Sequence, residues 1–372
     1  MVKLDKNKKE PLIHITKRKA ISKKHEWAIR LGSILIALVV CAIITTLTTH
    51  LNPISVYASM IDGSFGSERK VWALLKELSI LLMVSVALAP AFKMKFWNLG
   101  GGGQVMAGVL ATTTCMITLG DKLPNGVLIP LSLIAALFAG ALWAFIPAYC
   151  KAKWNTNETL FTLMMNYVAT QIVAYFIIIW ESPKGSGKIG IVNQHTQAGW
   201  LPIIAGKQYL LPVLISIAVT IFMYIYLKYS KQGYELSVVG ESQNTARYVG
   251  INVGKVIIRT LILCGLICGL TGWLLVAGTD HTMTTTIEAG RGFLGVMVAW
   301  LAHFNPIGMV LSGLLMVFMN RGGGEISTAF GLNKSFGDIL TGVILFFVIG
   351  SEFFINYQVH FRKSHGKEAA DV

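Results

Sequence analysis

Long apolar runs, separated by short polar gaps, constrain this chain more than any other feature. A run of about 20 apolar residues is long enough to cross a bilayer as a helix. Hydrophobic residues make up 54% of the chain and charged residues 13%, whereas a soluble domain carries roughly 25% charged residues. A soluble globular enzyme and a disordered chain are both excluded. We expect spans at residues 27–49, 71–92, 104–119, 127–149, 160–180, 209–227, 256–277 and 339–357.

Two shorter apolar segments, residues 292–303 and 307–320, are separated by Asn305 and Pro306. Each is shorter than a full crossing needs. Paired short segments interrupted by glycine or proline are typical of broken or re-entrant helices. One kinked helix, or two tilted short spans, remain alternatives. With this pair the count reaches ten, which predicts an all-α polytopic membrane protein of about ten transmembrane helices, with two short or broken segments near 292–320.

The distribution of basic residues predicts the orientation. Residues 1–26 form a basic tail, and segments rich in Lys and Arg stay in the cytoplasm. Ten segments would place both termini inside, giving a cytoplasmic tail (1–26), a transmembrane domain (27–357) and a cytoplasmic C-terminal tail (358–372) in the plasma membrane. The loop 181–208 would lie outside although it carries Lys184, Lys188 and Lys207. Nucleic-acid binding is disfavoured, because the basic tail lacks interleaved aromatic residues and a companion motif.

The sequence carries no motif for catalysis, metal binding or a bound cofactor. Gly187-Lys188 is followed by Ile189, where an ATP-binding loop needs Ser or Thr. The run Gly100–Gly103 fails the dinucleotide fingerprint, because Met106 stands at its third glycine position. Five cysteines are scattered through the chain and have no matching ligand pair. We therefore expect no catalytic residue, no metal and no cofactor on this chain.

Ionisable residues are rare within the predicted spans, where ion-coupled carriers need them. Candidates are Lys76, Glu77, Arg259 and Glu352, while Asp280, Glu288 and Arg291 are expected in a polar segment outside the membrane. This pattern argues against a proton or sodium relay. It favours a neutral solute that is handled by uncharged groups.

Small residues in two spans indicate close helix packing. Gly265 and Gly269 lie four residues apart in one span, and Ala135, Ala139 and Gly140 lie together in another. Such residues let helix backbones approach closely in lipid.

The polar stretch between the spans at 209–227 and 256–277 has short helical character, with glycines at its joints. Composition alone favours an ordinary solvated loop. However, VGESQNTARYVGI at 239–251 resembles the VGxNxxAARYAGI segment of ABC-transporter permeases of the branched-chain amino acid, ribose and nucleoside type. Four further stretches, in family order, resemble that family's NIGVEGQ, LWGxIPGxLKA, NEVIxTLMLNY and GxGFxGIAVA motifs: NLGGGGQ (98–104), LWAFIPAYCKA (142–152), NETLFTLMMNY (157–167) and GRGFLGVMVA (290–299).

The resemblance implies a bacterial importer in which two permeases form the pathway and separate ATPase subunits bind ATP and Mg. A solute-binding protein or lipoprotein would deliver the solute from outside. The second permease could be the same chain or a paralogue. The LMxNY pattern at 163–167 points towards the nucleoside and simple-sugar branch. The segment 233–252 would couple to the ATPase through Glu235, Gly240, Glu241, Asn244, Ala246, Arg247 and Gly250.

One position departs from the family pattern, because the Glu of NIGVEGQ is Gly102 here. For the solute pathway the uncharged polar candidates are Asn98, Gln104, Asn166, Tyr167 and Asn305, whose amide and phenol groups can bind sugar hydroxyls or a base. Bonding between helices is the alternative role for each. Two other functions stay open: a stand-alone secondary carrier or channel, and an intramembrane enzyme, for which His281 and His303 are too isolated.

Overall fold

The computed structural model describes residues 13–18 and 22–361, so most of the predicted basic tail and residues 362–372 lie outside the described residues. The chain divides into two units, residues 1–63 with 320–372, and residues 64–319. Each unit is considered by itself.

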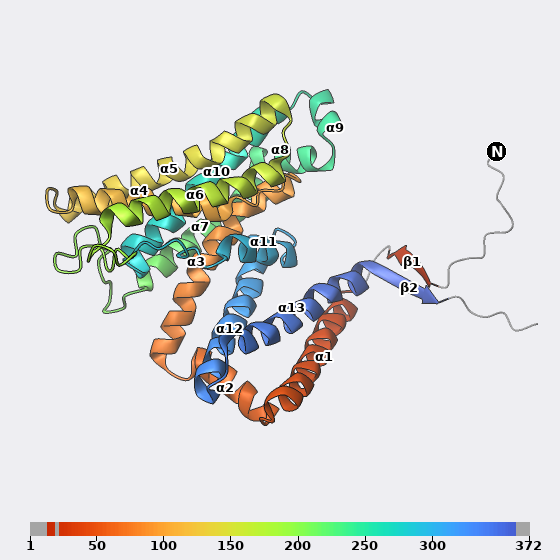
Figure 1. Cartoon of the computed structure of the whole chain (residues 1–372). Coiled ribbons are helices and arrows are strands. Elements are labelled where there is room, and N and C mark those ends of the chain that lie inside the picture. Colours follow the sequence, from red (N-terminus) through yellow and green to blue (C-terminus); the bar gives the residue numbers. More distant parts are fainter. Residues whose placement is uncertain (1–12, 19–21, 362–372) are drawn as a thin grey trace, which may run out of the picture. The chain divides into compact units, whose positions relative to one another are not determined.

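Within the described residues, nine helices are long and apolar enough to cross a membrane, which confirms the all-α polytopic class. These long helices are α1 (Lys23–Thr49), α3 (Glu68–Lys93), α4 (Gly101–Leu119), α5 (Asn125–Trp154), α6 (Glu158–Trp180), α7 (Leu210–Tyr229), α10 (Val253–Trp273) with its π-helical extension η1 (Leu274–Thr279), α12 (Pro306–Phe330) and α13 (Lys334–Asn356). The shorter helices are α2 (Pro53–Phe65), α8 (Lys231–Glu241), α9 (Gln243–Tyr248) and α11 (Arg291–Leu301). Figure 1 shows these elements.

In the first unit, α1 and α13 pack together and the strands at their outer ends pair. Arg30 Nη2 lies 2.8 Å from Glu352 Oε1, and the Cys41 thiol donates to the carbonyl of Leu340. Strand β1 (Ile13–Lys17) pairs antiparallel with β2 (Tyr357–Phe361). Because β1 precedes α1 and β2 follows α13, the start of α1 and the end of α13 lie on the same side of this unit.

The prediction of a second short segment at 307–320 is wrong, because α12 continues for 25 residues. The glycines after Asn320 interrupt the apolar pattern but serve close packing. A methyl group added at Gly322 would lie 3.1 Å from the Met60 side chain, and one at Gly323 would lie 3.1 Å from the backbone of Gly337. Helix α2 was also not predicted, since its 13 residues are too few for a crossing.

In the second unit, α3, α4, α5, α6, α7 and α10 run alternately between two ends of a bundle. We call one the loop end, because residues 181–208 lie there. At that end Asn193 Nδ2 donates to the carbonyl of Met116, 2.8 Å away, and Asn125 Oδ1 accepts from the Gly199 amide at 2.8 Å. We call the other the α9 end, where α8 and α9 project from the bundle, away from the loop in Figure 1.

The core of this second unit is the contact between α5 and α10. The backbone of Gly140 approaches Gly265 and Gly269 so closely that a methyl group at any of the three would collide with the other helix. This confirms the predicted packing role of these glycines. Ala136 completes the contact, whereas Ala135 and Ala139 line an apolar hollow of about 410 Å³ between α4, α5 and α6.

Candidate translocation and coupling sites

Helix α4 begins inside the bundle and not at its end. The amide of Gly103 donates to Asn166 Oδ1 at 2.7 Å, and Asn166 Nδ2 donates to the carbonyl of Leu99 at 2.7 Å. Asn166 lies eight residues beyond Glu158, the first residue of α6, which corresponds to about 12 Å along the helix. Since half the hydrocarbon core is about 15 Å, we infer that α4 starts near the middle of the membrane.

Helix α11 begins at the same depth and runs the opposite way. A methyl group added at Gly292 would lie only 2.8 Å from the amide nitrogen of Gly102. After 11 residues α11 ends near the α9 end, where Phe304 stacks on Phe92 with ring centroids 6.2 Å apart. Residues 281–290, which lead from the loop end to this point, form no regular helix. The segment predicted at 292–303 is therefore the helical half of a broken crossing.

Two of the predicted pathway amides are buried beside the start of α4. Asn98 Oδ1 accepts from the Gly100 amide at 3.0 Å and from Gln104 Nε2 at 3.4 Å. Asn98 Nδ2 and Gln104 Oε1 have no hydrogen-bond partner among the described residues, although both side chains are at most 1% exposed. Unpaired buried polar atoms are costly, so these two can bind a further polar group.

The structure brings together three of the five predicted pathway residues, Asn98, Gln104 and Asn166. Tyr167 follows Asn166 on α6 and is 67% exposed. Asn305 lies elsewhere, where its Oδ1 accepts from the Ile307 amide at the start of α12. A role in solute passage stays a prediction for all five.

Glu288 was expected in a polar segment outside the membrane, but its carboxylate lies between the starts of α4 and α11. Its Oε2 accepts from the amide of Gly292 at 3.1 Å, and a methyl group at Gly102 would lie 3.2 Å from the same oxygen. The polar composition of 281–290 suggested an external loop. Because α11 is too short to cross alone, this segment enters the bundle and carries Glu288 to mid-depth, with Arg291 beside it.

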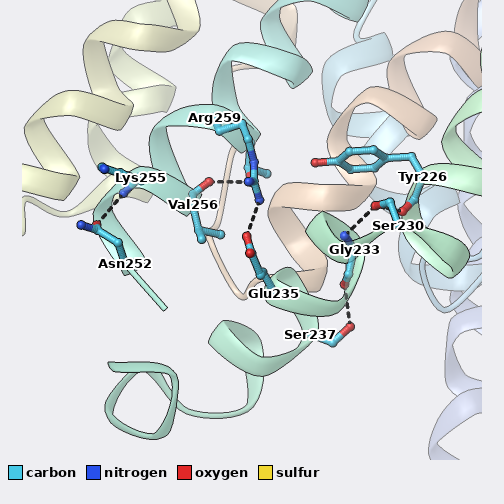
Figure 2. Close-up of polar contacts among 10 residues, drawn as sticks. Tyr226, Ser230, Gly233, Glu235, Ser237, Asn252, Lys255, Val256 and Arg259 are labelled. Atoms are coloured by element: carbon cyan, nitrogen blue, oxygen red, sulfur yellow. Dashed lines mark hydrogen bonds and ion pairs between the residues drawn. The ribbon is translucent and has the colours of Figure 1, made fainter. Parts of the chain in front are cut away.

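Other ionisable residues singled out in the sequence form ion pairs. Lys76 Nζ lies 2.7 Å from Asp280 Oδ1, and Arg259 Nη2 lies 3.0 Å from Glu235 Oε2. Arg259 therefore ties α10 to α8, as Figure 2 shows.

The polar stretch after α7 folds as two helices, not as one. Ser230 begins α8, its Oγ accepting from the Gly233 amide at 2.9 Å, while the Ser237 hydroxyl donates to the carbonyl of Gly233 at 3.1 Å (Figure 2). Ser242 ends α8 and caps α9 by accepting from the Thr245 amide at 3.2 Å. Helices α8 and α9, each begun by a serine cap, form a bent segment between α7 and α10 that we call the elbow.

The predicted coupling residues divide into a buried base and an exposed tip. Gly240 packs against the backbone of Lys93, and Ala246 is fully buried. Gly250 leaves the elbow with φ +84°, a conformation that favours glycine. Glu241, Asn244 and Arg247 are exposed.

Two adjacent exposed apolar residues at the tip of the elbow, after α9 begins, were not predicted from the sequence. Tyr248 is 93% exposed and Val249 is 60% exposed. The sequence does indicate them, since an aromatic residue and a β-branched residue are adjacent in an otherwise polar stretch. Isolated exposed apolar residues are ordinary, but a pair at the tip of a projecting elbow offers a contact surface.

A helical bundle with a broken crossing inside it and a projecting elbow is typical of membrane transport proteins. Residues 71–349 match the family described as the permease component of the branched-chain amino acid transport system. The chain belongs to this family, and it is a transport permease subunit of an ABC system, not an enzyme.

Curated relatives match along most of the chain. A glucose ABC transporter permease protein of Haloferax volcanii is 27% identical over 83% of this chain and 84% of its own length. A guanosine ABC transporter permease protein of Bacillus subtilis is 28% identical over 79% and 85%. A nucleoside ABC transporter permease protein of Lactococcus lactis is 25% identical over 80% and 84%. Among solved structures, PsaBC from Streptococcus pneumoniae in complex with Fab matches with a TM-score of 0.43 and 14% identity, covering 79% of this chain and 95% of that chain.

Proposed function

We propose that this permease subunit moves a small neutral solute, a nucleoside or a simple sugar, into a bacterial cell at the expense of ATP. The relatives named for guanosine, nucleosides and glucose support this class of solute. All of these solutes are uncharged and carry hydroxyl groups. The amides of Asn98 and Gln104, each with one unpaired polar atom, have the chemistry to bind hydroxyls or a base.

The observation that carries the ATP-driven mechanism is the exposed tip of the elbow. We infer that Tyr248 and Val249 on the tip enter a groove of a separate ATPase subunit, which binds ATP and Mg. Aromatic residues such as tyrosine are enriched among the residues that dominate binding energy at protein interfaces. This chain itself would bind no cofactor.

Movement of the elbow has a direct route to the spans. Glu235 of α8 is tied to Arg259 of α10, and Gly240 of α8 rests on the end of α3. Helix α3 packs against α11, since Gly295 fits against Val84 and Ser85. A pull on the elbow would bias the bundle between two arrangements, which is how a partner drives a gated change.

We further propose that both termini are cytoplasmic. The nine long helices of the described residues and the broken crossing at 281–301 make ten crossings, an even number. Pairing of β1 with β2 at one side of the first unit agrees with that count. Lysines at the α9 end, including Lys93, Lys151 and Lys228, favour this end as the cytoplasmic one.

The remaining partners follow from the proposed mechanism. A second permease, either another copy or a paralogue, would complete the pathway. A solute-binding protein or lipoprotein would dock at the loop end.

The docking proposal is tested by co-purification with the ATPase. Gly240 and Ala246 are poor test positions because they are buried, so bulky substitutions there would disturb folding. Tyr248→Asp alters only the tip, and Lys231→Asp at the exposed start of α8 is the matched control. We expect Tyr248→Asp to abolish co-purification and uptake while Lys231→Asp retains both. Retention of both by Tyr248→Asp would contradict docking at α9.

The solute is tested by competition in cells that carry the complete transporter. We expect unlabelled nucleosides to suppress uptake of labelled guanosine at concentrations where glucose does not. Uptake of labelled glucose, with no uptake of labelled guanosine, would assign the chain to the sugar class. Uptake that persists when the ATPase is inactivated would instead indicate a stand-alone carrier.

A further inference from the structure

The first turns of α4 and α11 meet near mid-depth in the second unit. The first amides of a helix have no acceptor within the helix, and the aligned peptide dipoles make each helix start partly positive. At α4, Asn98 and Asn166 satisfy the amides of Gly100 and Gly103 with uncharged oxygens. Two positive helix starts in contact repel each other, so this junction favours a negative charge.

The carboxylate of Glu288 supplies that charge. Its Oε2 accepts from the Gly292 amide in the first turn of α11 at 3.1 Å. A methyl group added at Gly102, in the first turn of α4, would lie 3.2 Å from Oε2 and 3.3 Å from the Cδ atom of Glu288. The carboxylate thus lies against both helix starts at once.

Gly102 and Gly292 make this arrangement possible. Both are buried, and a methyl group at Gly292 would lie 2.8 Å from the Gly102 amide nitrogen. A Cβ atom at position 102 would make a tight contact with the Glu288 carboxylate, which would have to shift by a few tenths of an ångström. A glutamate at position 102 would therefore bring a second carboxylate next to that of Glu288.

We propose that Glu288 is a positioning residue that holds the start of α11 against the start of α4, from the position that Gly102 leaves empty. It acts by fixing the joint of the broken crossing and not by contact with the solute.

A carboxylate exchange tests this proposal. Glu288→Gly removes the carboxylate, Gly102→Glu places a second one next to it, and the double variant Gly102→Glu/Glu288→Gly moves it to the other chain segment. We expect each single variant to lower the melting temperature of the purified permease. The double variant should regain at least half of the decrease in melting temperature that the less stable single variant shows. If the decreases in melting temperature of the two single variants add up in the double variant, the proposal is wrong.

Two controls separate charge and position from general effects. Gly102→Gln/Glu288→Gly restores the shape without the charge and should recover less than the glutamate exchange. Gly126 lies in the first turn of α5 with nothing within 4 Å of an added methyl group, so Gly126→Glu/Glu288→Gly adds a carboxylate at an unrelated helix start. Recovery by that variant would contradict a site-specific role.

Transport kinetics distinguish positioning from solute contact, and this readout alone rests on the proposed function. Because a charge at a helix start biases an equilibrium by about fivefold, we expect Glu288→Gln to lower the maximal rate of ATP-driven uptake by about that factor. The KM for solute should stay unchanged. A raised KM with an unchanged maximal rate would mean that Glu288 contacts the solute. If no solute is transported at all, the melting experiment still decides the proposal.

Discussion

Asn166 holds Gly103 by a hydrogen bond of 2.7 Å from the Gly103 amide to its Oδ1, so that α6 fixes the start of α4 at mid-depth. The other end of the same amide group donates to the carbonyl of Leu99. A helix start inside a bilayer leaves polar backbone groups that no water satisfies. The two bonds of Asn166 resolve this for one donor and one acceptor, which explains why a polar residue stands in the middle of an apolar span.

Replacement of Asn166 by leucine should therefore destabilise the bundle. Both bonds are lost and two backbone groups stay unsatisfied, which costs about 1–3 kcal/mol for each buried group. We expect a clear decrease in the melting temperature in detergent. Gln171→Leu, an exposed position on the same helix, is the control and should leave the melting temperature nearly unchanged. Equal effects of both variants would contradict the capping role of Asn166.

Gly265→Ala tests the contact between α5 and α10. The added methyl group would collide with the carbonyl of Gly140, and overpacking of this kind costs about 1–3 kcal/mol. Gly254 lies on the same helix, and its methyl group would sit 3.6 Å from the Cβ atom of Ala152, an ordinary contact. Gly254→Ala should thus be neutral or slightly stabilising. The free energy of unfolding should be lower for Gly265→Ala than for Gly254→Ala. A lower value for Gly254→Ala would contradict the contact between α5 and α10.

Loss of the Arg259–Glu235 ion pair should uncouple ATP hydrolysis from transport with little effect on stability. Both side chains are partly exposed, and such pairs contribute only about 0.2–1 kcal/mol. We expect Arg259→Met to transport less solute per ATP hydrolysed. Lys151→Met breaks the Lys151–Glu158 pair at the same end, which does not involve α8, and should keep the ratio. An unchanged ratio in Arg259→Met would exclude the pair from the coupling route.

His281 should make the stability of the loop end depend on pH. Burial lowers the pKa of His281 from its usual value of 6.5. The ring stacks on Trp200 with centroids 3.8 Å apart, and Nδ1 lies 3.0 Å from the carbonyl of Val276. Since the unfolded chain takes up the proton more readily, stability is full above about pH 6.5 and falls as the pH decreases below it.

His281→Phe keeps an aromatic ring against Trp200 and removes the titrating group. Its melting temperature should change less between about pH 7 and pH 5 than that of the unmodified protein. His195→Gln, at an exposed position in the same loop, should retain the original pH dependence. An identical pH profile in His281→Phe would assign the effect to another group.

The sequence predicted the class of fold well because apolar length decides whether a helix can span a bilayer. It also predicted the close contact of Gly265 with the neighbouring span, since few residues other than glycine permit such an approach. The end of α12 was misjudged because Gly322 and Gly323 look like a break, although they permit contacts with Met60 and Gly337. Spacing along the chain does not show which surface a glycine meets.

The candidate site was predicted only in part, for a similar reason. Asn98, Gln104 and Asn166 were chosen as uncharged polar residues in apolar surroundings, and the structure places them together. Glu288 was expected outside because its neighbours are polar. The position of Glu288 depends on the shortness of α11, which requires residues 281–290 to enter the bundle. No local sequence pattern shows this. Tyr248 was not predicted as a contact residue because it lies within a polar motif, and its exposure depends on how α9 projects from the bundle.

The central claim, solute movement driven by a separate ATPase, is tested most directly by uptake into proteoliposomes that contain the purified permeases, ATPase and solute-binding protein. With ATP supplied on the α9 side, we predict uptake of labelled guanosine that stops when ATP is replaced by ADP and is lost in Tyr248→Asp. Uptake driven by an ion gradient without ATP, and unaffected by Tyr248→Asp, would contradict the account.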